Sequence, residues 1–114
     1  MKFFVIFILT LLITQVNAGE YEGYKLSWSP PNAYTNSEKL SVKLDLKSYK
    51  IYYGPTIEAV RENTVTIDPL LTSFYLSGLN KSVVRNSPII YLAIAAISKS
   101  GSESDLSKII FFLP

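Results

Sequence analysis

The sequence contains no cysteine and no histidine. Without cysteine no disulfide can hold the fold, and lipid attachment through an N-terminal cysteine is excluded. Without histidine the chain lacks the commonest general base and transition-metal ligand, so Ser-His and Cys-His nucleophile arrangements are excluded. The acidic residues are scattered, with no group suited to paired-carboxylate hydrolysis or a calcium loop, and Gly-rich phosphate loops are absent. We therefore expect a non-enzyme that uses no cofactor or metal.

A strong excess of either charge is also missing. The chain has 11 basic and 9 acidic residues, which gives a formal net charge of +2. Such a balance offers no electrostatic argument for binding nucleic acid. The partner that we expect instead is another protein.

Residues 1–18 differ in composition from the rest of the chain. Lys2 is followed by an apolar run over residues 3–9, and Val16 and Ala18 stand where a signal peptidase requires small or aliphatic residues. The run is shorter than the ~20 apolar residues that a membrane helix needs. We predict a signal peptide over residues 1–18, cleaved after Ala18, and one domain over residues 19–114. The alternative is an uncleaved anchor.

This interpretation fixes the expected location. A cleaved leader implies an exported protein, extracellular or periplasmic, that meets a membrane only during export. A chain of 114 residues leaves room for one domain after the leader.

After the leader, apolar residues recur with a period of two, which is typical of strands rather than helices. Turn residues such as the Pro30-Pro31 and Gly54-Pro55 pairs separate the alternating segments. The sequence therefore predicts an all-β fold. The expected strands are residues 24–28, 49–53, 65–67, 73–77, 89–97 and 109–113.

Several segments carry more specific expectations. Trp28 ends the first alternating segment, and we interpret it as a core anchor. Leu46 and Tyr49 are both inward candidates but lie three residues apart, which predicts a bulge or turn between them. Residues 40–46 are expected to form a short strand or an ordered loop, and residues 80–87 a polar loop.

Five segments in order resemble a known family. They read LSWSPP at residues 26–31, SYKIYYG at 48–54, TSFYLSGL at 72–79, IYLAIAAI at 90–97 followed by Ser100-Gly101, and LSKIIFFL at 106–113. These segments resemble strands B, C, E, F and G of a fibronectin type III domain, in the form found in bacterial exported proteins. The resemblance implies an immunoglobulin-like antiparallel β-sandwich.

Two departures from the family pattern stand out. Only residues 19–23 lie between the predicted cleavage site and Tyr24, so strand A is expected to be short or missing. The connection that follows Leu79 is longer than the family's, and Ile90 occupies the place of its corner tyrosine, with Tyr91 next to it. The tyrosine corner of the family is therefore in doubt.

The segment from residue 89 to residue 97 is apolar on both faces. Alternation places Ile90, Leu92, Ile94 and Ala96 in the core and their neighbours on the outer face. An exposed apolar face of an antiparallel sheet is a candidate interaction surface. The alternative is that loop residues, such as 80–87, cover this face. The candidate surface consists of Tyr52, Tyr91, Ala93, Ala95 and Ile97.

The last segment is a candidate edge strand. Ile109, Ile110, Phe111 and Phe112 are uncharged and prone to β structure, so they could pair with another chain, or the strand could be buried in the sandwich. If strand A is missing, the edge of residues 24–28 could likewise accept a partner's strand by β-augmentation.

These features together predict a binding module that acts through protein contacts. One alternative is a carbohydrate- or cell-surface-binding adhesin, for which exposed tyrosines such as Tyr34, Tyr52 and Tyr75 would stack on sugars. Another is a self-assembling structural subunit built through the uncovered strands, so self-association is also considered.

Overall fold

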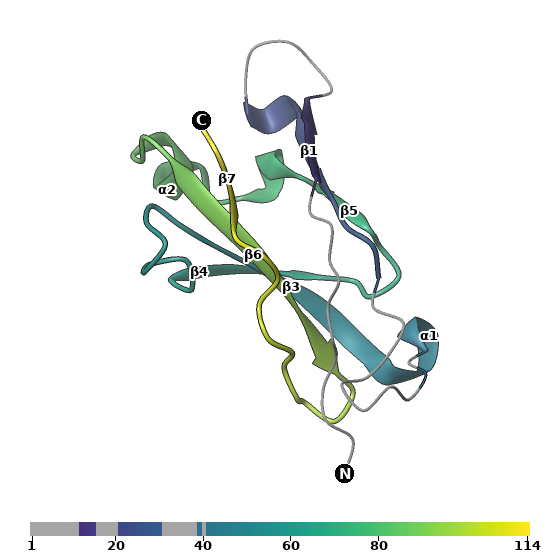
Figure 1. Cartoon of the computed structure of the whole chain (residues 1–114). Coiled ribbons are helices and arrows are strands. Elements are labelled where there is room, and N and C mark those ends of the chain that lie inside the picture. The colour runs from purple at the N-terminus through teal and green to yellow at the C-terminus, as the bar shows by residue number, and fades with distance from the viewer. Residues whose placement is uncertain (1–11, 16–20, 31–38, 40) are drawn as a thin grey trace.

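The computed structural model describes residues 12–15, 21–30, 39 and 41–114, and it consists of two antiparallel sheets (Figure 1). One sheet has the order β1-β2-β5, and the other has the order β4-β3-β6-β7. The prediction of an all-β fold is confirmed. The strands are β1 (Leu12–Gln15), β2 (Tyr24–Ser27), β3 (Leu46–Gly54), β4 (Asn63–Ile67), β5 (Ser73–Tyr75), β6 (Ile90–Ser98) and β7 (Ile110–Phe112).

Helical structure in the described part of the chain is limited to short turns between strands. These are the 3-10 helices η1 (Tyr21–Gly23) and η2 (Leu76–Gly78) and the α-helices α1 (Val42–Asp45) and α2 (Lys81–Arg85). Within the described residues, no helix has the length and apolar character needed to cross a membrane.

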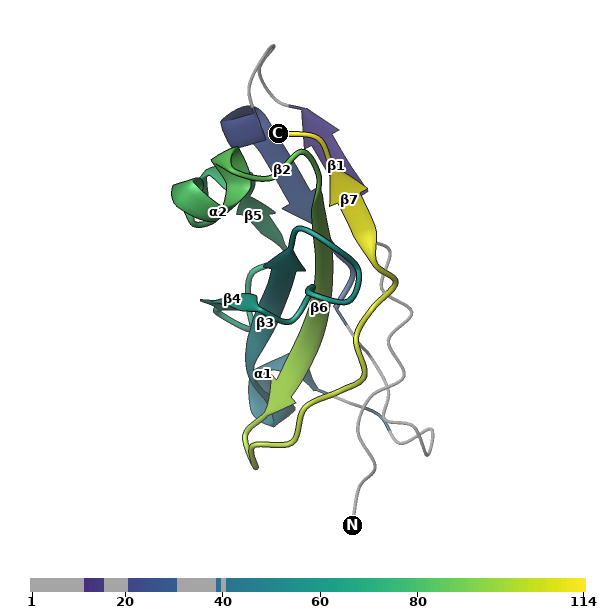
Figure 2. The same cartoon turned by 90° about the vertical axis from the view of Figure 1, so that its left-hand side faces the viewer.

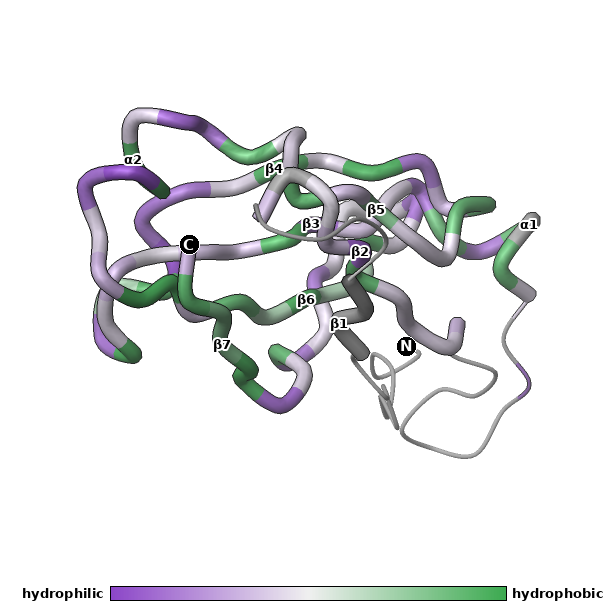
Figure 3. The backbone as a smooth tube through the Cα atoms, turned by 90° about the horizontal axis from the view of Figure 1, so that it is seen from above, coloured by the Kyte–Doolittle hydropathy of each residue, from purple (hydrophilic) through white to green (hydrophobic). Residues whose placement is uncertain are grey.

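The core lies between the two sheets. Trp28, which follows β2, is 5% exposed, and its ring meets the ring of Tyr49 on β3 edge to face at 5.4 Å. This pair joins the first sheet to the second, so the prediction that Trp28 is a core anchor is confirmed. Figure 3 shows apolar residues concentrated along β6 and β7.

The period of two predicted the inward residues of β6 correctly. Ile90, Leu92, Ile94 and Ala96 are all fully buried in the core cluster. The expected register shift is also present, because the pairing of β3 with β6 is irregular between Leu46 and Ser48.

Two predictions about the connections are wrong. Residues 42–45, which fall in the segment predicted as a strand or loop, form α1 instead, because the Ser41 side chain accepts a hydrogen bond from the Leu44 amide. The segment expected to be a polar loop contains α2. Asn80 caps this helix, and Val84 on it is fully buried in the core. Both helices begin at a polar cap that closes the first turn.

β1 corrects the expected origin of the first strand. The sheet does have a short strand beside β2, but it comes from residues 12–15 of the predicted leader rather than from residues 19–23. The predicted cleavage site after Ala18 lies outside the described residues. The same short segment is therefore both part of the predicted leader and the edge strand of the first sheet.

Two tyrosines in the core differ in how their hydroxyl groups are satisfied. The Tyr53 hydroxyl accepts a hydrogen bond from the Asn80 amide at 3.0 Å, which ties β3 to the start of α2. The Tyr49 hydroxyl and the Trp28 indole nitrogen are buried without a hydrogen-bond partner. Burial raises the pKa of Tyr49 to about 12. The nearby Trp28 indole lowers this pKa by a smaller amount, although the two groups do not form a hydrogen bond. Tyr49 is therefore uncharged at neutral pH.

Candidate interaction surface

The outer face of β3 and β6 is not the exposed patch that the sequence predicted. Tyr52, Ala93 and Ala95 are 7%, 1% and 0% exposed, and Tyr91 and Ile97 are half-buried. The pairing register gives the physical reason for the burial of the alanines. Ala93 lies opposite Tyr52 and Ala95 opposite Lys50, so longer side chains on β3 share a face with the small residues on β6.

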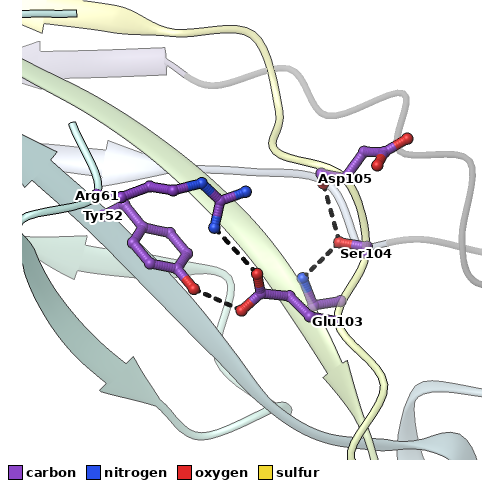
Figure 4. Close-up of polar contacts among 6 residues, drawn as sticks. Tyr52, Arg61, Glu103, Ser104 and Asp105 are labelled. Atoms are coloured by element: carbon purple, nitrogen blue, oxygen red, sulfur yellow. Dashed lines mark hydrogen bonds and ion pairs between the residues drawn. The ribbon is translucent and has the colours of Figure 1, made fainter. Parts of the chain in front are cut away.

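Tyr52 itself is covered by two charged residues from loops (Figure 4). The Tyr52 hydroxyl donates a hydrogen bond to Glu103 at 2.5 Å, and the Arg61 guanidinium lies 4.8 Å from the centre of the Tyr52 ring. Arg61 also pairs with the other carboxylate oxygen of Glu103 at 3.1 Å. We call Tyr52, Arg61 and Glu103 the outer cluster. Residues 80–87, the cover considered from the sequence, contribute nothing to it.

Arg61 reaches the outer cluster because the chain turns tightly after β3. A side chain at Gly54 would collide with the backbone of Ala59, since a Cβ there would lie 2.0 Å from the Ala59 carbonyl oxygen. Val60, the residue before Arg61, is 5% exposed. Glycine at position 54 is therefore what allows the turn to fold back over the sheet.

Glu103 is placed by the turn that follows β6. Gly101 has a φ of +92°, a conformation that glycine adopts without strain, and its amide donates to the Ser98 carbonyl at 2.9 Å. The Ser98 amide donates to the Ser102 carbonyl at 2.8 Å. The chain then pairs Glu103 with Ile97, which brings the carboxylate to the outer face.

Beyond Glu103, two serines bind residues 103–108 to β6. The Ser104 amide donates to the Ala96 carbonyl at 2.9 Å, and the Ser104 hydroxyl accepts from the Ala96 amide at 2.8 Å. Ser107 makes the same two bonds with Ile94, both at 2.9 Å. Each serine thus satisfies both backbone groups of one β6 residue. In Figure 2 this segment leaves the end of β6 and returns beside it.

The spacing of these pairs shows why the hydroxyls are needed. Ala96 and Ile94 are two residues apart on β6, whereas their partners Ser104 and Ser107 are three residues apart on the returning chain. The next pair, Leu92 with Ile110, lies two residues further along β6 and again three residues further along the returning chain. An extra residue at each step bulges the chain outward. The serine hydroxyls fill the place of the acceptors that a regular strand would provide.

The expected edge strand is shorter than predicted and has two different faces. Its regular part is β7, in which Phe112 is 4% exposed and packs near Tyr21, with ring centres 5.9 Å apart. Phe111 is 57% exposed and lies 6.1 Å from the ring of Tyr91. Ile109 and Ile110 are half-buried. Within β7, Phe111 therefore faces solvent and Phe112 faces the core.

Tyr91, a residue of the predicted surface that stays partly accessible, lies beside the exposed Phe111 of the predicted edge strand. Tyr91 lies opposite Gly54 on β3 and opposite Phe111 on β7. Because glycine has no side chain, the aromatic neighbour of Tyr91 in this register is Phe111. We call Tyr91 and Phe111 the aromatic pair. The sequence indicated both residues but not their pairing.

The tyrosines considered for sugar stacking do not come together. Tyr52 is buried on the four-stranded sheet, whereas Tyr75, on the three-stranded sheet, is 49% exposed with the Lys25 ammonium 5.9 Å from its ring centre. Tyr34 lies outside the described residues. Tyr52 and Tyr75 therefore do not share a surface on which a sugar could stack.

The outer cluster shifts two pKa values in opposite directions. Burial, the hydrogen bond to Glu103 and its charge raise the pKa of Tyr52 above 10.0. Burial alone would raise the pKa of Glu103. The hydrogen bonds from Tyr52 and Arg61 and the charges of Arg61 and Lys50 outweigh that effect and lower the pKa of Glu103 below 4.5. The cluster therefore favours a neutral tyrosine and an ionised glutamate.

The variant Glu103→Gln should lower the free energy of unfolding at pH 7 by less than about 1 kcal/mol, because the Arg61 ion pair is partly exposed. Since the folded-state pKa of Glu103 is lowered, its stabilisation is present above its ordinary pKa and is lost as pH falls through the folded value. The difference from wild type should therefore shrink at pH 3. Urea unfolding at both pH values measures it.

The matched control is Glu58→Gln, an exposed glutamate in the loop that also carries Arg61. It should change the free energy of unfolding little at either pH. An equal loss at pH 7 and pH 3 for Glu103→Gln would show that the charge of Glu103 does not matter.

Arg61 and Glu103 are the residues of this face that the sequence analysis did not single out. Each lies in a loop whose alternation is weak, and nothing in the local pattern relates positions 42 residues apart. Comparison with protein-family models, with curated protein sequences and with solved structures finds no match to this chain.

Proposed function

We propose that this chain is an exported, non-catalytic binding module of the fibronectin type III class that contacts a partner protein through the aromatic pair. Phe111 carries the proposal, because its side chain is 57% exposed on an edge strand and lies against a second aromatic ring, and adjoining apolar side chains at an open edge favour contact with another chain. Tyr91 beside it enlarges the apolar area.

The proposed class has separate support. The strand order β1-β2-β5 in one sheet and β4-β3-β6-β7 in the other is compatible with the sandwich of this class, and Trp28 joins the two sheets through Tyr49. Export rests on the leader pattern of residues 1–18. In the absence of histidine and cysteine, a contact surface accounts for the accessible side chains better than a catalytic site does.

A photo-crosslinking residue such as benzoylphenylalanine tests the proposal when it replaces Phe111 in the full chain. Irradiation of the cells that naturally make the protein should yield one defined adduct with another protein. The matched control carries the same residue in place of Tyr75, which is similarly exposed but lies on the other sheet, and it should not yield that adduct. Mass spectrometry identifies the attached chain.

Two results would count against the proposed surface. If position 111 yields no adduct, or the same adducts as position 75, Phe111 is not a contact residue. If the attached chain is a second copy of the same protein, the module is a self-assembling subunit rather than a receptor for a different partner.

A further inference from the structure

β2 pairs with one strand on each side, and one of these two strands, β1, lies in the predicted leader. β5 pairs with residues 25–27 on one side, and β1 pairs antiparallel with residues 24–27 on the other. In the β1 register, Ile13 lies opposite Leu26 and Thr14 lies opposite Lys25. The backbone groups of β2 that face β1 therefore have a strand of the leader as their partner.

Removal of the leader would take β1 away. The inference rests on the proposed function in this respect, since cleavage after Ala18 is part of the export that it assumes. The cut would fall between β1 and β2, so residues 12–15 would leave with the leader. The processed chain would then present β2 as an open edge of the first sheet.

β2 is held in place by contacts that do not involve β1. Leu26 is 1% exposed in the core. The Trp28 amide donates to the Thr72 carbonyl at 3.0 Å, just beyond the end of β2. At the other end, Tyr24 packs against Phe112, with ring centres 6.3 Å apart. All these residues follow position 18, so β2 should keep its place when β1 leaves.

We propose that the open edge of β2 in the processed protein accepts an extended segment of a partner protein, which takes the place of β1. Main-chain hydrogen bonds would supply affinity, as in β-augmentation. The register defines the segment: at least four extended residues, antiparallel to β2, with an apolar residue opposite Leu26. Residues that lie opposite in an antiparallel pair share a face, and Leu26 faces the core.

A strand withdrawn from a second copy is a poorer occupant. The second sheet has a free edge at each end, on β4 and on β7. Ile67 on β4 is buried in the core, and Phe112 on β7 is buried against Tyr21 and Tyr24. Donating either strand would remove these contacts from the copy that gives it. The extended segment therefore belongs to a different chain, and Leu12–Gln15 shows a sequence that this edge accepts.

The first measurement is the mass of the protein recovered after export. A chain that begins at Gly19 is expected. A chain that retains residues 1–18 contradicts the export in the proposed function but leaves the acceptor edge to be tested separately.

The second measurement is amide hydrogen exchange of residues 24–27 in the exported protein, with an added peptide of residues 10–17, TLLITQVN. The peptide should slow exchange at least tenfold at those amides of β2 that face it. A scrambled peptide of the same composition should have no effect. Equal effects of the two peptides would overturn the proposal. The proposal would also be overturned if, without any peptide, exchange of residues 24–27 slowed as the protein concentration rose. Copies of the protein would then be pairing with each other.

A variant of the full chain tests the same edge without any need for processing. Proline has no amide hydrogen, and amides along an edge strand point alternately toward and away from its neighbour. The double variant Ile13→Pro with Thr14→Pro must therefore remove one amide hydrogen that faces β2. Exchange of residues 24–27 should speed up and slow again when the peptide is added. Ile13→Val with Thr14→Ser, the control, should leave exchange unchanged. If the proline variant gains no protection from the peptide, the edge is not an acceptor.

Discussion

Replacing Trp28 with alanine should lower the free energy of unfolding by about 3–5 kcal/mol, the usual cost of removing a buried aromatic residue. The side chain is 5% exposed and packs against Tyr49 on the opposite sheet, so the change leaves a cavity where the two sheets meet. A small domain has a total stability of about 5–15 kcal/mol, so the loss is a large share of it. Urea unfolding followed by circular dichroism measures the effect.

Leu70→Ala is the control, because Leu70 is 67% exposed. It should change the free energy of unfolding by no more than about 0.5 kcal/mol, as surface substitutions usually do. Trp28→Phe should fall between the two, since it keeps an aromatic ring against Tyr49. A loss below about 1 kcal/mol for Trp28→Ala would mean that Trp28 does not join the two sheets.

Replacing Ser104 and Ser107 together with alanine should lower the free energy of unfolding by about 2–6 kcal/mol. Each hydroxyl accepts a hydrogen bond from a buried β6 amide, and each amide left without a partner costs about 1–3 kcal/mol. Hydrogen exchange should also speed up at the amides of Ile94 and Ala96. Denaturant unfolding and amide exchange on the same sample measure both effects.

The double variant Ser77→Ala with Ser102→Ala is the matched control, because both serines are exposed. It removes the same number of hydroxyls and should leave stability nearly unchanged. If the two double variants lose similar amounts, the hydroxyls of Ser104 and Ser107 are not essential acceptors for β6. Water would then satisfy these amides in the variant.

The strands could be predicted because their pattern is local. Apolar residues two apart indicate one face of a strand, so Ile90, Leu92, Ile94 and Ala96 were assigned to the core correctly. The spacing from Leu46 to Tyr49 broke the same rule by one residue, and this predicted the irregular register there. Both inferences depend on neighbouring residues alone.

The cover of the outer face could not be predicted because it depends on distant residues. Tyr52, Arg61 and Glu103 come from three separate segments, and their contact follows from how two loops fold over one sheet. The helix α2 was missed for a different reason. Its five helical residues are too few to show a period of 3.6.

The two extra residues beside β6 also limit how this protein could aggregate. A growing cross-β stack needs a long, flat row of unpaired backbone groups. Residues 103–109 present a bulged chain instead, whose regular pairing with β6 resumes only in the three residues of β7. A foreign strand that docks on β7 would lose its register after these residues. The chain can thus expose Phe111 to a partner while offering a poor template for fibril growth.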